Sequence, residues 1–387
     1  MASSTPSTTS AAPCDVCFDR PDDGWLPRIA PIALGIDGSQ LAPLVDKAKQ
    51  TRSDHMLLVT AQGVVLERHW GDDIPIETQS LTKSVVALGI LALIADGEIS
   101  SLDEPLHTYF PEMAHDGRRA ITLRHVLSHS SGLDASDGIN DADDRLAYAR
   151  ALKLERTPGT RFQYNNAACQ LLAGVIADAA GISLDRYLSR RILAPLGIVD
   201  AHWSRDRSGG IQAYFGLELR SRDLVKLGLL LLQEGNWKQR QLLPQHLVVE
   251  ATKPSATSLS YGLLFWRRTQ LRQTKAALER WPFLAPLAGK TFRTEDDYFR
   301  TLRRHAPKDA VHGLVLAHPL TTSVLEERRD QDTAFLAVGG LGQRLVVYPQ
   351  RGLVAVRQHR RHPRDEGHER LIHWRQFESE LESALRR

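Results

Sequence analysis

A polar six-residue stretch followed by an apolar run of helical length constrains this chain more than any other segment. Residues 78–83 (TQSLTK) lead directly into residues 84–94 (SVVALGILALI), which carry no charge. Apolar side chains would occupy every side of a helix over residues 84–94. The run therefore predicts a helix buried in the core rather than an amphipathic helix on the surface.

Ser80 and Lys83 lie at the entrance of this predicted helix, three residues apart, so their side chains share one face. Poor solvation would lower the pKa of the Lys83 amine, which could then accept the Ser80 proton. The N–H groups of a first helical turn have no partners within the helix and suit an oxyanion. Ser-x-x-Lys alone is a weak signal, because both residue types are common, so a purely structural role stays open here.

Length and composition indicate a large globular protein. The chain has 387 residues, of which 42% are hydrophobic, which suits one large or two closely packed domains. Its 49 basic and 46 acidic residues give a net charge of +3, which provides no reason to expect a nucleic acid or an anionic membrane as a partner. No run reaches the length of a transmembrane helix and no secretory signal is apparent, so we expect a cytoplasmic protein.

The three cysteines do not form a disulfide framework. Cys14 and Cys17 lie in a leader rich in Ser, Thr, Ala and Pro, without a second cysteine pair. Chance thiols are favoured there over a zinc or redox site. Cys169 falls in an apolar helical pattern and is expected in the core.

Strand-like runs lie near both ends of the chain, with helical patterns between them. Residues 56–60 and 64–68 predict a hairpin, and residues 335–338, 344–348 and 353–357 predict an antiparallel meander. Together they predict an α+β fold: an antiparallel β-sheet flanked by helices, as a helix–sheet–helix sandwich with an inserted all-helical subdomain. The expected divisions are a flexible tail over 1–35 that drapes onto the body, an α/β domain over 36–105 and 215–387 with an insert at 268–330, and a helical subdomain over 106–214.

Two further clusters carry polar or backbone groups suited to chemistry. Tyr164 and Asn166 follow a Pro-Gly turn just before a predicted helix, where Asn165 or Asn166 could simply cap the helix. Alternatively, a tyrosine beside an amine would have a lowered pKa and relay protons. The glycine-rich residues 339–343 lie between two strands, as in a hairpin or bulge, and the Gly340 N–H could serve as a second oxyanion donor.

In combination these clusters resemble the penicillin-recognising serine hydrolases, which include class C β-lactamases, D-alanyl-D-alanine carboxypeptidases, esterases and 6-aminohexanoate-dimer hydrolase. The resemblance covers roughly residues 50–266 and 333–360. It is carried by QSLTKS (79–84), DGEISSLDEP (96–105), ITLRHVLSHSSGL (121–133), PGTRFQYNN (158–166) and GGLGQ (339–343). In motif style the chain is most similar to the esterase and 6-aminohexanoate-dimer hydrolase branch.

The resemblance implies a β-lactamase/transpeptidase-like fold and a role for each matching residue. Ser80 would be the acyl-forming nucleophile, Lys83 its general base, and Tyr164 the proton relay to the leaving group. Asn166 would hold the Lys83 amine and the substrate amide. The N–H groups of Ser80 and Gly340 would form the oxyanion hole, with Gly339 beside them. No cofactor is implied. No metal is expected either, because His125 and His129 lack an evident third ligand.

One departure from the family pattern bears on the substrate. The β-lactamase branch has Lys-Thr-Gly or His-Thr-Gly on the strand that here reads FLAVG (335–339), and this strand offers no cation. We therefore expect a serine hydrolase that cleaves an ester or amide of a small acyl compound through acyl-Ser80. An acyltransferase, a β-lactamase or D-alanyl peptidase, and a non-catalytic binding protein remain alternatives. A homodimer is compatible with the sequence, and the 268–330 insert would either wall the pocket or be a peripheral addition.

Overall fold

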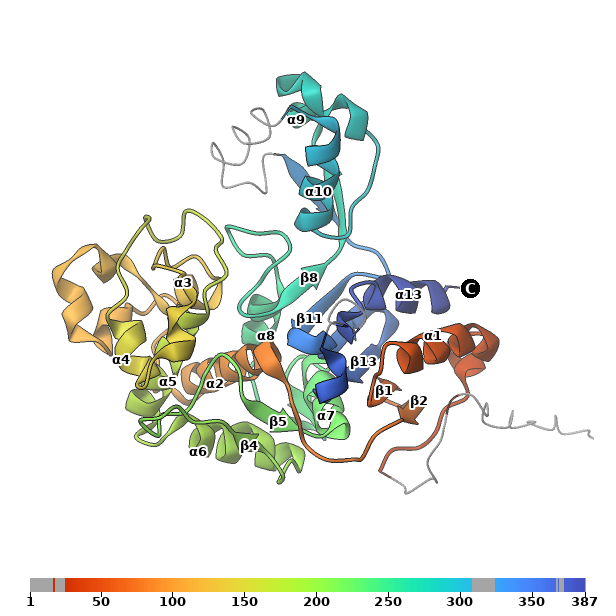
Figure 1. The fold of residues 1–387 in the computed structure, drawn as a ribbon, viewed down its shortest axis with the longest axis horizontal. Coiled ribbons are helices and arrows are strands. Elements are labelled where there is room, and N and C mark those ends of the chain that lie inside the picture. Colours follow the sequence, from red (N-terminus) through yellow and green to blue (C-terminus); the bar gives the residue numbers. More distant parts are fainter. Residues whose placement is uncertain (1–16, 18–24, 308–323, 367, 369–371, 387) are drawn as a thin grey trace, which may run out of the picture.

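The computed structural model describes Cys17 and residues 25–307, 324–366, 368 and 372–386. A six-stranded antiparallel sheet lies at its centre, in the order β2-β1-β13-β12-β11-β8 (Figure 1). Strands that far apart in sequence pair because their apolar runs can be buried only together. Leu57 lies opposite Val356, and Leu336 lies between Val346 and Trp266. The α+β sandwich predicted from the sequence is thus confirmed.

Both faces of this sheet are covered by helices, which explains why its strands are continuously apolar rather than alternating. On one face, Met56 and Leu58 pack with α1 (Gly38–Gln50) and α13 (Phe377–Ala384). On the other, Leu57 and Val59 pack with α2 (Thr82–Asp96) and α7 (Ser221–Leu232). Successive residues of one strand therefore enter two different cores.

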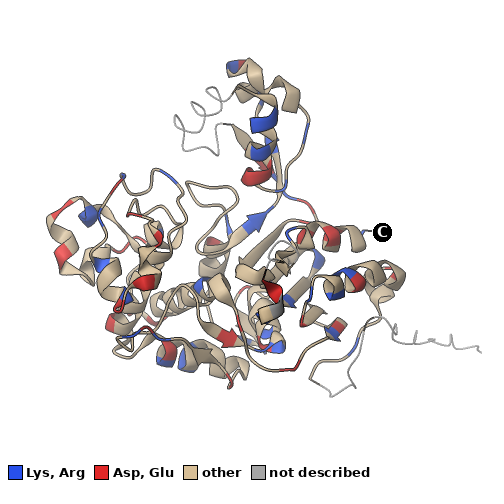
Figure 2. Cartoon of the chain, in the orientation of Figure 1, with Lys and Arg blue, Asp and Glu red and all other residues tan. Residues whose placement is uncertain are grey.

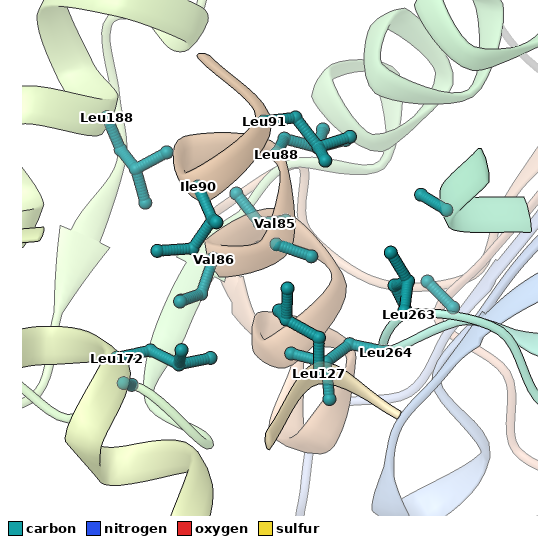
Figure 3. Packing of buried hydrophobic residues seen from close by; sticks show 14 of the residues in the cluster. Val85, Val86, Leu88, Ile90, Leu91, Leu127, Leu172, Leu188, Leu263 and Leu264 are labelled. Atoms are coloured by element: carbon teal, nitrogen blue, oxygen red, sulfur yellow. The ribbon is translucent and has the colours of Figure 1, made fainter. Parts of the chain in front are cut away.

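Helix α2 runs through the larger core and is surrounded by apolar side chains from every side (Figure 3). Leu172 and Leu188 approach it from one side, and Leu263 and Leu264 from the other, where Leu127 lies beside Leu264 (Figure 3). Gly89 allows close packing of α6 (Leu184–Leu188), since a Cβ there would lie 3.0 Å from Leu188 Cδ2. One apolar core therefore joins the helical part to the sheet.

Residues 79–96 form the one helix in the described part of the chain that is long and apolar enough to cross a membrane. This differs from the sequence analysis, which found no run of that length. Nearly all of its side chains from Thr82 to Leu93 are buried inside the protein, so the segment serves as a core helix. Figure 2 shows charged residues of both signs spread over the surrounding elements.

A separate lobe projects from the far end of β8, drawn at the top of Figure 1. Strands β9 and β10 pair in antiparallel register, with Leu325 opposite Gln273. Helices α9 and α10 pack on this pair around Leu271, Leu302 and Tyr298. This pairing places two strands in the 268–330 insert, for which no strand was predicted from the sequence. Residues 308–323 of that insert lie outside the described residues.

The remaining bounds complete the architecture. The strands are β1 (His55–Thr60), β2 (Gly63–His69), β3 (Ile76–Glu77), β4 (His202–Trp203), β5 (Leu217–Leu219), β6 (Asn236–Trp237), β7 (Arg240–Gln241), β8 (Trp266–Arg268), β9 (Gln270–Gln273), β10 (Leu325–Arg328), β11 (Ala334–Val338), β12 (Arg344–Tyr348) and β13 (Leu353–Gln358). The other α-helices are α3 (Leu123–Leu127), α4 (Arg145–Arg150), α5 (Asn166–Ala180), α8 (Gln245–Thr252), α9 (Lys275–Arg280) and α10 (Glu295–His305).

The described part of the N-terminal segment lies on the body of the protein. The Ile29 N–H donates to Val64 O at 2.8 Å, and the Val64 N–H donates to Pro27 O at the same distance. Cys17 is fully buried, and its carbonyl accepts the Glu67 N–H. Cys14 lies outside the described residues.

Candidate active site

The turn that carries Ser80 is tied to strand β5. The backbone N–H and the hydroxyl of Thr78 both donate to Leu217 O at 2.8 Å. The Thr82 hydroxyl accepts the Leu217 N–H at 3.2 Å. Ser80 itself lies in the short 3-10 turn η2 (Gln79–Leu81) that precedes α2. Anchors on both sides of Ser80 therefore fix its position relative to β5.

Ser80 and Lys83 face each other as their spacing predicts, with Lys83 Nζ 2.9 Å from Ser80 Oγ. Ser80 is half-buried, whereas Lys83 is only 1% exposed. Burial lowers the pKa of the Lys83 amine to about 8. Its second contact is the carbonyl of Tyr214, which accepts an N–H from Nζ at 2.7 Å. An amine that is partly neutral near pH 7 and directed at a hydroxyl can act as a general base.

Tyr164 approaches the same hydroxyl from the loop before α5. Lys83 Nζ lies 5.0 Å from the centre of its ring. Burial raises the pKa of the phenol, against the smaller lowering effect of the nearby Ser80 side chain. This corrects the expectation that the neighbouring amine would lower it. A phenol with a raised pKa keeps its proton and is suited to donate it.

The two asparagines after Tyr164 have different surroundings. Asn165 caps α5, because its Oδ1 accepts the Ala168 N–H at 2.9 Å, and its Nδ2 donates to Leu133 O at 3.1 Å. The Oδ1 of Asn166 is buried without a hydrogen-bond partner in the described structure. The resemblance assigned the Lys83 amine to Asn166, but the described contacts of that amine are with Ser80 and the Tyr214 carbonyl.

His129 lies directly behind Tyr164, a neighbour that the sequence analysis missed. The two ring centres are 4.3 Å apart, and His129 Nδ1 accepts the Asn165 N–H at 3.1 Å. Burial, and secondarily the charge of Lys83, hold the pKa of His129 well below its usual value, so the ring is neutral. Burial also raises the pKa of the Cys169 thiol beside it to about 12. The uncharged His129 ring and Cys169 thiol thus pack behind the Tyr164 phenol and place no charge next to it.

The glycine-rich turn meets the Ser80 turn at the end of β11. A Cβ on Gly339 would lie 2.1 Å from Thr78 O, so only glycine permits this approach. Gly340 follows it and lies beside Gln79, with Gln79 Oε1 3.6 Å from where a Cβ would be. Gln79 adopts a φ of 53°, a left-handed conformation that costs a non-glycine residue about 1 kcal/mol. The structure thus brings Gly339 and Gly340 next to Ser80.

Aromatic side chains form a wall next to Tyr164. The indole of Trp266 is stacked on the Tyr164 ring, with 6.1 Å between centres and 17° between planes. Phe162 and Tyr261 complete the group, at 6.2 Å and 4.7 Å from Trp266. Tyr164 and Trp266 are both half-buried, so the wall is open to a substrate.

His125 has a structural role at the start of α3. Its backbone N–H donates to the Thr122 hydroxyl, and its Nδ1 accepts the Thr122 N–H at 3.2 Å, a reciprocal cap. Within the described ranges, no group of three or more His, Cys, Asp or Glu side chains could hold a metal ion.

Comparison with known proteins places this geometry in context. A family model described as Beta-lactamase matches residues 47–376. Esterase EstB of Burkholderia gladioli is 29% identical over 278 residues, which cover 60% of this chain and 69% of the esterase. The D-alanyl-D-alanine-carboxypeptidase/endopeptidase AmpH of Escherichia coli is 28% identical over 146 residues, but the match covers only 34% of this chain and 37% of AmpH.

Solved structures show the same fold at low sequence identity. A proposed 6-aminohexanoate-dimer hydrolase from Bacillus anthracis superposes with a TM-score of 0.60 and 18% identity, covering 87% of this chain and 82% of that one. A proposed beta-lactamase from Bacteroides dorei gives a TM-score of 0.63 and 16% identity, covering 90% and 99%. At such identities the likeness concerns the fold.

Proposed function

Because this chain belongs to the beta-lactamase family, we propose that it is a serine hydrolase that cleaves an ester or amide of a small acyl compound through an acyl-Ser80 intermediate. The observation that carries the proposal is that one half-buried hydroxyl, Ser80 Oγ, bonds to Lys83 and lies near Tyr164, and that these two proton carriers are in complementary states. Lys83 has a pKa lowered to about 8, and Tyr164 has a raised pKa. One can take a proton near neutral pH and the other can give one.

Acylation follows from these contacts. Neutral Lys83 directs one N–H to the Tyr214 carbonyl and uses its lone pair to accept the Ser80 proton while Oγ attacks the substrate carbonyl. The negative charge on the carbonyl oxygen would be stabilised by the N–H groups of Ser80 and Gly340. Tyr164 then donates its proton to the leaving alcohol or amine and is reprotonated from Lys83. Water hydrolyses the acyl-enzyme by the reverse proton path.

Two features favour an ester or a simple amide over a β-lactam. The side chain before the glycine-rich turn is Val338, so β11 provides no cation for a substrate carboxylate at this point. EstB, which aligns over more than half of this chain, is named as an esterase. We also propose a small-molecule substrate and a cytoplasmic location; the latter is supported by the buried free thiol of Cys169.

The test is covalent labelling combined with turnover. A fluorophosphonate probe should add its mass to the peptide that contains Ser80, and 4-nitrophenyl esters should be hydrolysed. Both signals should vanish in Ser80→Ala and persist in Ser84→Ala, the matched control one helical turn away, whose hydroxyl bonds to Leu264 O. Lys83→Met and Tyr164→Phe should each lower kcat/KM by at least about a hundredfold. Ester turnover in Ser80→Ala equal to that of the wild type would contradict the proposal. A chromogenic cephalosporin and short amides would define the substrate branch.

A further inference from the structure

Arg145, at the start of α4, is a cation without an acidic partner. No carboxylate oxygen of the described residues lies within 4.0 Å of its guanidinium, in contrast to many other arginines of this chain. Its two described side-chain hydrogen bonds are with neutral acceptors, because Nη1 donates to Gln212 Oε1 and Nη2 donates to Asn140 O. Nε is buried and has no acceptor. An arginine has five N–H donors, so one N–H on each Nη atom remains available besides the buried Nε–H.

The acidic side chains around Arg145 are committed to other groups. Asp144 caps α4 by accepting the Ala147 N–H at 2.8 Å. Asp206 accepts the backbone N–H of Arg145, rather than its guanidinium, at 3.0 Å and the Gly210 N–H at 2.8 Å. Asp143 pairs with Arg207 at the surface. Neutral groups therefore hold the guanidinium in position, and no acidic side chain of the described residues contacts it to balance its charge.

The Arg145 guanidinium lies next to Tyr214, whose carbonyl orients Lys83, the proposed general base. The guanidinium carbon is 5.8 Å from the centre of the Tyr214 ring, and Lys83 Nζ is 5.6 Å from the same ring centre. Arg145 also lies 5.2 Å from the ring of Phe215, which is half-buried and follows directly on the Tyr214 carbonyl. The Tyr214 phenol donates to Asn140 Oδ1 at 3.0 Å, which ties this wall to the loop before α4.

We propose that Arg145 binds a carboxylate on the acyl part of the substrate, and that the protein therefore prefers acyl groups that end in a carboxylate. This inference rests on the proposed function. Tyr164 is the proton donor to the leaving group, so the leaving group lies toward Tyr164 and Trp266. The acyl chain then extends along Phe215 toward the guanidinium. Arginine suits this role because its planar fork matches the two oxygens of a carboxylate.

The experiment compares two series of 4-nitrophenyl esters that differ in one charge. One series consists of the mono-esters of adipic, pimelic and suberic acid, and the other of the same compounds with the free carboxylate capped as a methyl ester. The preference is the ratio of kcat/KM for each charged ester to that for its capped partner. The variants are Arg145→Gln, Arg145→Lys and the control Arg207→Gln, which removes a surface arginine whose side chain is 81% exposed.

The wild type should prefer at least one charged ester, and added salt should weaken that preference. Arg145→Gln should lower the preference at least about tenfold through loss of a charge-assisted hydrogen bond. Arg145→Lys should recover part of it, and Arg207→Gln should keep it. A wild-type ratio of one or less for the whole series, or the same ratio in Arg145→Gln, would overturn the assignment.

Failure of the proposed function gives a different pattern. If no ester of either series is hydrolysed in a Ser80-dependent way, the proposed function fails, and Arg145 is then tested by binding alone. Calorimetry with adipate should show binding to the wild type and to Ser80→Ala, and none to Arg145→Gln. Equal binding to all three proteins, or no binding to any of them, would refute a carboxylate site at Arg145.

Discussion

The pKa of Lys83 sets a measurable pH dependence for acylation. Burial lowers this pKa from 10.5 to about 8. At pH 7 about one molecule in ten then carries the neutral amine, whereas an unshifted lysine would be neutral in only about 0.03% of molecules. Burial thus raises the fraction of competent enzyme at pH 7 about 300-fold. The variable to change is therefore the pH, because it sets the fraction of molecules in which the Lys83 amine is neutral.

The expected kcat/KM rises about tenfold per pH unit below pH 7, bends near pH 8 and is level above about pH 9. The sign follows from the base being active in its neutral form. The assay is the initial rate with an excess of a neutral 4-nitrophenyl ester between pH 5.5 and 9.5, corrected at each pH with Ser80→Ala for spontaneous hydrolysis. Because kcat/KM reports the free enzyme, the bend can be compared directly with the state of Lys83 in the absence of substrate.

Two results would refute this reasoning. A bend near pH 10 would show that the amine is solvated like an ordinary lysine and that its burial has no catalytic effect. A flat profile from pH 6 upward would show that proton removal from Ser80 does not depend on Lys83. Tyr164→Phe should keep the bend near pH 8 at a much lower plateau, since the phenol has a raised pKa and does not titrate in this range.

Two further predictions concern stability and the glycine-rich turn. Because the pKa of Lys83 is lowered in the folded protein, burial of this amine destabilises the fold fully below pH 8 and less as the pH rises toward 10.5. In urea unfolding, the free energy of unfolding of the wild type relative to Lys83→Met should therefore increase by about 1 kcal/mol between pH 7 and pH 9. A difference between the two proteins that does not change with pH would contradict this prediction. Gly339→Ala should lose about 1–3 kcal/mol and most esterase activity, because its Cβ would meet Thr78 O at 2.1 Å. Gly117→Ala is the control, since its Cβ would meet only the Leu154 side chain, and equal behaviour of the two variants would argue against a tight contact at Gly339.

The parts of the site that follow from local geometry could be predicted from the sequence. Ser80 and Lys83 share a helical face whatever the rest of the chain does, because three residues span nearly one turn. Tyr164 was predicted only through its motif, since it reaches Ser80 across the fold. The second contact of Lys83 is the Tyr214 carbonyl, a backbone group 131 residues away that leaves no trace in side-chain chemistry.

Strands that depend on partners far away in the sequence were likewise missed, whereas strands with a local apolar pattern were predicted. Strands of the central sheet were predicted because both of their faces are apolar. Strands β9 and β10 have the sequences QLRQ and LEER, without an apolar pattern. β8 runs from Trp266 to Arg268 with the sequence WRR, which also lacks an apolar pattern. Its Arg267 and Arg268 are buried because they pair with Glu327 and Glu382, which the sequence places far away.

Burial of Lys83 links the fold to the chemistry. Water must be kept from the amine for its pKa to fall, and the elements packed around α2 achieve this, since every residue of the helix from Thr82 to Leu93 is buried. At neutral pH this environment costs about 3 kcal/mol of folding free energy, since an ordinary lysine would be charged. A surface helix with one apolar stripe could hold Ser80 and Lys83 at the same spacing, but it would leave the amine protonated. The uninterrupted apolar run after Lys83 is therefore as much a requirement of the proposed reaction as the two polar residues themselves.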